Sequence, residues 1–71
     1  MPVWKLVEIV GISDKSWEDA TKNAVNEAAK TIRNITRVSI EEFDAKIEDD
    51  KVVAFRTRIK IIFEIERGEQ E

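Results

Sequence analysis

Four cations that alternate along two predicted strands (residues 36–47 and 52–66) are the side chains best placed to bind a ligand. They are Arg37, Arg56, Arg58 and Lys60. Strict alternation places all four on one face of the predicted sheet. A guanidinium binds phosphate or carboxylate through two parallel hydrogen bonds, so these residues could line an anion-binding pocket where two subunits meet. The alternative, which is the more common arrangement, is ion pairing across strands or subunits with Glu8, Glu41 and Glu64.

Other side chains have weaker claims to a functional role. Glu48, Asp49 and Asp50 could hold a hard cation such as calcium, but they lack the spacing and the glycine of an EF-hand loop, which favours a solvated turn. Trp17 could stack on a ligand, although its place in an apolar helical stripe favours a packing role. The role of Trp4 stays open, because the sequence does not indicate which face of its strand is buried.

The composition argues against several functional classes. The chain has no histidine and no cysteine, which most zinc sites and nucleophilic triads require, so we expect no enzyme and no catalytic residue. Its net charge of −3, from 12 basic and 15 acidic residues, is opposite in sign to that of a typical nucleic-acid-binding domain. No apolar run approaches the roughly 20 residues of a membrane-spanning helix, and we expect no secretory signal. The sequence therefore predicts a cytoplasmic protein that binds neither nucleic acid nor membrane.

The segment 52–66 gives the strongest structural signal, because its apolar and charged residues alternate. One face carries Val53, Phe55, Thr57, Ile59, Ile61, Phe63 and Ile65. At about 3.3 Å per residue, such a strand reaches roughly 50 Å. A chain of 71 residues has little to cover so long an element, and without disulfides or a structural metal, self-association is the remaining way to stabilise it. Part of the apolar face is therefore predicted to be covered by another chain.

The rest of the chain predicts one helix and two further strands. Residues 3–10 form the first strand, which ends at 11–13, and residues 17–33 form the helix, with Ser16 as N-cap and Asn34 as stop signal. Residues 36–47 form the second strand, and a polar turn at 48–51 makes it a hairpin with the third. Alternation divides the second strand into two faces, one with Val38, Ile40 and Glu42 and the other with Arg37, Ser39, Glu41, Phe43, Ala45 and Ile47.

These elements predict one domain over residues 1–71, of the α+β class and with the order β-α-β-β. A right-handed crossover through the helix makes the first two strands parallel. The third strand then fits between them, in the order 1-3-2, with every neighbouring pair antiparallel. The helix packs on one face of this three-stranded sheet and spans roughly 25 Å, at 1.5 Å per residue. The opposite face must meet water or another subunit.

Several segments of the chain resemble the dodecin family. They are 7–13 (VEIVGIS), 16–20 (SWEDA), 28–35 (AAKTIRNI) and 63–64 (FE). No single motif is diagnostic, but the ordered set is fairly specific and covers roughly residues 3–66. The resemblance implies the β-α-β-β fold and a hollow homo-oligomeric shell, a dodecamer with cubic-group symmetry.

The resemblance also implies a flavin (riboflavin, FMN or FAD) stored in pockets between subunits. In the best-known dodecins, a tryptophan near the start of the second strand stacks on the flavin ring, and a glutamine on the third strand hydrogen-bonds its edge. These positions correspond to Arg37 and Arg56, so the resemblance makes them the candidate cofactor-binding residues. A guanidinium is smaller than an indole and, unlike glutamine, offers only donors. We therefore expect weak flavin binding or none. The alternatives are a dodecin-like assembly that binds ions such as calcium, one that binds an anion other than flavin, or a purely structural scaffold.

Overall fold

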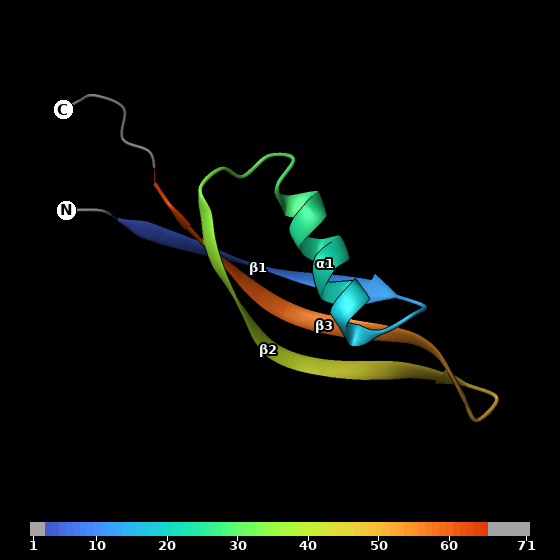
Figure 1. The fold of residues 1–71 in the computed structure, drawn as a ribbon. Helices are drawn as coiled ribbons and strands as arrows, with labels where there is room; N and C mark the ends of the chain where they lie inside the picture. Colours follow the sequence, from blue (N-terminus) through green and yellow to red (C-terminus); the bar gives the residue numbers. More distant parts are fainter. Residues whose placement is uncertain (1–2, 66–71) are drawn as a thin grey trace.

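The computed structural model describes residues 3–65 (Figure 1). The chain forms β1 (Trp4–Ser13), α1 (Trp17–Ala28), β2 (Ile35–Glu48) and β3 (Lys51–Glu64). The strands make one sheet in the order β1-β3-β2, and both neighbouring pairs are antiparallel. Helix α1 lies over one face of this sheet, and the strands run past it (Figure 1). The predicted α+β class, β-α-β-β topology and strand order are confirmed.

The helix is shorter than the predicted 17–33. It begins where expected, because the Oγ of Ser16 accepts a hydrogen bond from the backbone N–H of Asp19 at 2.9 Å. It ends at Ala28, since β2 already begins at residue 35 and the residues between must carry the chain back to the sheet. Asn34, in the left-handed region with a φ of 64°, makes this final turn. The helix of 12 residues spans about 18 Å and covers even less of the sheet than expected.

A bulge at Glu41 reverses the predicted faces of the second half of β2. Ile40 lies on the helix side, and the next residue that pairs with β3 is Glu42. The extra residue shifts the alternation by one position. Phe43 therefore shares the helix side with Ile40, whereas Glu42 and Asp44 lie on the opposite face. The prediction for this half of the strand is wrong, because strict alternation leaves no place for an extra residue.

The core between α1 and the sheet is small. Within the described residues, its buried apolar side chains are Ala20, Ala24, Ala28, Ile59 and Ile61. Alanines let the helix lie close to the sheet, but they bury little apolar area. The radius of gyration is 15.0 Å, whereas a compact domain of this length has a value of about 11 Å. The chain is therefore too extended to form a large core of its own.

Close contact between β1 and α1 depends on Gly11. The sequence predicts that the first strand covers residues 3–10 and ends at 11–13. In the structure it continues through Gly11 to Ser13. A Cβ atom at Gly11 would lie 2.1 Å from the backbone oxygen of Ala20 and 2.9 Å from the Cβ of Ala24. Only glycine fits at this position, because the nearest atom belongs to the backbone of the helix.

The face of the sheet opposite α1 is called the outer face here. By register it carries Trp4, Leu6, Glu8, Val10 and Ile12 of β1, Ala54, Arg56, Arg58, Lys60, Ile62 and Glu64 of β3, and Arg37, Ser39, Glu42, Asp44 and Lys46 of β2. No helix or strand of the described chain covers it. Its apolar residues on β1 are about half exposed: Trp4 by 52%, Leu6 by 52%, Val10 by 49% and Ile12 by 59%. The predicted mismatch between a short helix and long strands is confirmed, and it leaves apolar surface open.

One free edge of the sheet is partly closed by the helix. Strands β1 and β2 are the two edge strands. The Nδ2 of Asn23, on α1, donates a hydrogen bond to the backbone carbonyl of Ile12, on β1, at 3.0 Å. This contact satisfies a backbone acceptor near the free edge.

Replacement of Gly11 by alanine is expected to destabilise the protein by about 1–3 kcal/mol, because the added methyl group must displace the backbone of α1. Denaturant unfolding followed by circular dichroism measures the loss. The double variant Gly11→Ala/Ala24→Gly removes the nearest side chain but leaves the oxygen of Ala20 in place. It should therefore stay destabilised, and a return to native stability would contradict this explanation.

Candidate functional site on the outer face

Cross-strand pairing places the cations of the outer face opposite acidic side chains. Asp44 lies opposite Arg56, and Glu42 lies opposite Arg58. Both acids reach this face through the bulge at Glu41. Opposite charges on paired positions of neighbouring strands attract one another, so the bulge determines the electrostatics of the outer face.

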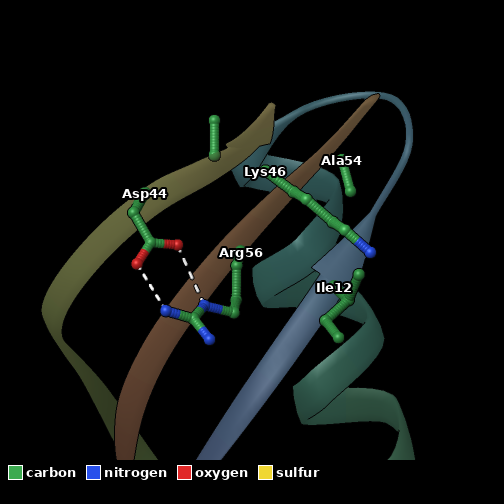
Figure 2. A pocket seen from close by; sticks show the side chains of 6 residues that line it. Ile12, Asp44, Lys46, Ala54 and Arg56 are labelled. Atoms are coloured by element: carbon green, nitrogen blue, oxygen red, sulfur yellow. Dashed lines mark hydrogen bonds and ion pairs between the residues drawn. The ribbon is translucent and has the colours of Figure 1, made fainter. Parts of the chain in front are cut away.

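Arg56 is held by Asp44 in a bidentate ion pair (Figure 2). Its Nε donates to Oδ1 of Asp44 at 2.9 Å, and its Nη2 donates to Oδ2 at 2.5 Å. The hydrogen bond from Arg56 lowers the pKa of the Asp44 carboxyl below its ordinary value, and the same bond raises the pKa of Arg56. The pair borders an open pocket of about 320 Å³, which is also lined by Ile12, Ala45, Lys46 and Ala54. One of the two candidate cofactor-binding residues is thus already bound to a carboxylate of its own chain.

Arg58 and Lys60 are also paired with acids. The Nε of Arg58 donates to Oε1 of Glu42 at 3.0 Å, and its Nη1 donates to Glu8, so Arg58 links all three strands. The Nζ of Lys60 lies 4.0 Å from an oxygen of Glu41. The predicted partners Glu8 and Glu41 are confirmed. Glu42 is an unexpected partner, because only the bulge brings it to this face.

Arg37 has a different environment. Its guanidinium carbon lies 5.9 Å from the ring centroid of Trp4, an arrangement in which the π face of the indole attracts the cation. Within residues 3–65, Arg37 has no carboxylate at 4.0 Å or less. Glu64, the third predicted ion-pair partner, lies opposite Trp4 and makes no ion pair in that same range. The structure thus places Trp4 beside Arg37 on the outer face, a contact that the sequence pattern did not indicate.

A single chain does not bring Arg37 and Arg56 together. Arg37 lies opposite Ile62, six positions along β3 from Arg56. At about 3.3 Å per residue, the two positions are roughly 20 Å apart. A small ligand therefore cannot contact both residues within one chain.

Trp17 is a packing residue, as its helical stripe indicates. Its ring centroid lies 5.0 Å from that of Phe55 and 5.4 Å from that of Phe43. Its Nε1 donates to the backbone carbonyl of Asp44 at 2.8 Å. This contact anchors the start of α1 to the part of β2 that follows the bulge.

Of the acidic residues 48–50, Glu48 ends β2, and Asp49 and Asp50 form the two-residue turn between β2 and β3. Asp49 and Asp50 have φ values of 53° and 63°, the signs that a type I′ hairpin turn requires. Nowhere in residues 3–65 do three or more Asp, Glu, Cys or His side chains come together in a way that could hold a metal ion. The same residues include no helix with the length and apolar character to span a membrane.

Comparison with known proteins relates the chain to one family throughout. The family model described as Dodecin matches residues 3–66. A curated relative, calcium dodecin of Mycobacterium tuberculosis, is 28% identical over 65 residues, which are 92% of each protein. The structure of dodecin from Streptomyces coelicolor has a TM-score of 0.90 at 27% identity and covers 94% of this chain and 96% of that chain. The structure of calcium dodecin from M. tuberculosis has a TM-score of 0.80 at 25% identity, with 97% and 99% covered.

The ion pair between Asp44 and Arg56 is expected to weaken in acid. Because folding lowers the pKa of Asp44 below 3.8, the pair contributes stability above that pH, and this contribution is lost as the pH falls through the lower folded pKa. A double-mutant cycle with Asp44→Asn and Arg56→Gln, measured by denaturant unfolding, should show favourable coupling at about pH 7 and a smaller coupling at about pH 2. Coupling that is the same at both pH values would contradict a charge-dependent pair.

Proposed function

The chain belongs to the dodecin family, and on this basis we propose that its copies assemble in the cytoplasm into a hollow shell of twelve subunits, which stores a small ligand where subunits meet. One observation carries the proposal: the half-exposed apolar row of Trp4, Leu6, Val10 and Ile12 on the outer face. These side chains lie on one strand and share one face. A second copy can therefore lie along this row and cover Val10 and Ile12, with a small ligand held between the two copies at the end with Trp4 and Leu6.

The small core supports this proposal. Five buried apolar side chains, three of them alanines, offset little of the entropy lost when the chain becomes ordered. The protein has no cysteine that could form a disulfide. Burial of the outer face against another copy contributes roughly 25 cal/mol per Å² of apolar surface, so assembly stabilises each subunit.

The proposed ligand site lies between subunits. In the best-known dodecins, the two corresponding positions contact one flat ligand, and in this chain Arg37 and Arg56 are roughly 20 Å apart. Flavin is the first candidate ligand, because it is the ligand of the best-known dodecins. Binding should be weak, since Asp44 already binds the Nε and Nη2 donors of Arg56 and Arg37 offers a smaller stacking surface than tryptophan.

Calcium is the second candidate ligand. It is favoured by the similarity to a protein named calcium dodecin. A calcium ion takes six to eight oxygen ligands, and the described part of one chain assembles no group of three acids for a metal. Carboxylates from several copies would therefore be needed, and the exposed Glu48, Asp49 and Asp50 at the hairpin turn are available for this. A shell that takes up neither ligand would act as a scaffold.

The assembly is expected to depend on the outer face. Light scattering should give the native protein a mass near twelve times its 8.2 kDa. Ile12→Lys places a charge in the proposed interface and should lower this mass, whereas the exposure of Ile12 within one chain spares the fold. The matched variant Asn26→Lys adds the same charge on the exposed side of α1 and should leave the mass unchanged. An 8.2 kDa native particle, or equal masses for the two variants, would contradict the shell.

Ligand titrations are expected to separate the two candidates. FMN fluorescence should be quenched only weakly by the native protein, and the double variant Arg37→Trp/Arg56→Gln should bind FMN about tenfold or more tightly, because an indole restores the stacking surface. The control Arg37→Gln/Arg56→Gln removes the same charges without adding a ring and should gain nothing. Calorimetry with calcium chloride tests the second candidate, and the absence of any binding heat would exclude it.

A further inference from the structure

Arg37 differs from the other cations of the outer face. Lys46, Arg56, Arg58 and Lys60 each have a carboxylate oxygen within 4.0 Å. Arg37 has none within residues 3–65 and lies over the ring of Trp4 instead. Its charge is therefore not neutralised by the described part of its own chain.

The stacked position suits Arg37 for anion binding. A guanidinium that lies over an aromatic ring uses one of its two faces and keeps its N–H donors, which point outward in its own plane. These donors match the two oxygens of a carboxylate or a phosphate. The exposed indole of Trp4 also limits the hydration of the cation, which strengthens the attraction to an anion.

The surroundings of Arg37 offer an apolar surface for the rest of a ligand. Leu6 and Arg37 both lie opposite Ile62 on β3, one from each side. Leu6 and Trp4 are each 52% exposed. Glu64 lies opposite Trp4, so its negative charge repels an acidic group at that end and directs this group toward Arg37.

We propose that Trp4 and Arg37 form a binding site selective for planar aromatic acids, in which the ring of the ligand lies against Trp4 and Leu6 and its acidic group pairs with Arg37. The proposal rests on the proposed function, since it specifies the ligand class of the site on the outer face. Trp4 supplies the aromatic surface, and Arg37 selects for negative charge. A neutral aromatic compound of the same size meets the same surface but lacks the ion pair.

Calorimetric titration of the native protein with 2-naphthoate and with neutral 2-naphthol tests the selectivity. We expect 2-naphthoate to bind about tenfold more tightly, the factor that one charge-assisted hydrogen-bond pair provides. Arg37→Gln should abolish this preference, and Trp4→Leu should weaken the binding of both compounds. Lys5→Gln is the matched control, because Lys5 is next to Trp4 in sequence but lies on the helix side, opposite Phe63. It should keep the full preference.

Equal affinities for the two compounds would overturn the proposal, as would a preference that survives Arg37→Gln or is lost equally in Lys5→Gln. Light scattering on the same samples separates this test from that of the shell. An assembled protein that binds neither compound overturns the aromatic-acid site and leaves the shell intact. A protein that stays at 8.2 kDa but prefers 2-naphthoate supports the site and overturns the shell.

Discussion

A short helix on a long sheet is the constraint on which the rest of the structure depends. The 12 residues of α1 span about 18 Å, whereas the 14 residues of β3 span about 46 Å. The alanines of α1 and the glycine at position 11 bring the helix close to the middle of the sheet, where Ile59 and Ile61 are fully buried. The ends of the strands and the whole outer face extend beyond this contact. The fold therefore leaves a broad sheet face that its own helix does not cover.

The bulge at Glu41 determines which charged side chains lie on the outer face. Without it, Glu42 would face the helix and Phe43 would face outward. With it, Phe43 packs against Trp17, and the acids of β2 reach the arginines of β3. One extra residue thus turns Phe43 toward the helix and brings carboxylates to Arg56 and Arg58. Arg37 lies before the bulge and keeps its charge unpaired within residues 3–65.

Features that depend on local alternation were predictable from the sequence. The alternation of β3 from Ala54 onward, the N-cap at Ser16 and a hairpin turn within residues 48–51 are local, and the structure confirms them. The end of α1 and the faces of β2 depend on how the helix meets the sheet, which no local pattern records. The contact between Trp4 and Arg37 likewise arises across three strands. Two of the acidic partners, Glu8 and Glu41, could therefore be named from the sequence. The partners Glu42, Asp44 and Trp4 could not, because they depend on the bulge and on contacts across the sheet.

The amide of Asn23 limits the ways in which copies can join. A free strand edge accepts further strands without end, which is the route to fibres. Asn23 occupies the carbonyl of Ile12, which an incoming strand would otherwise use. A single side-chain amide in this way makes this end of the β1 edge a poorer template for an added strand.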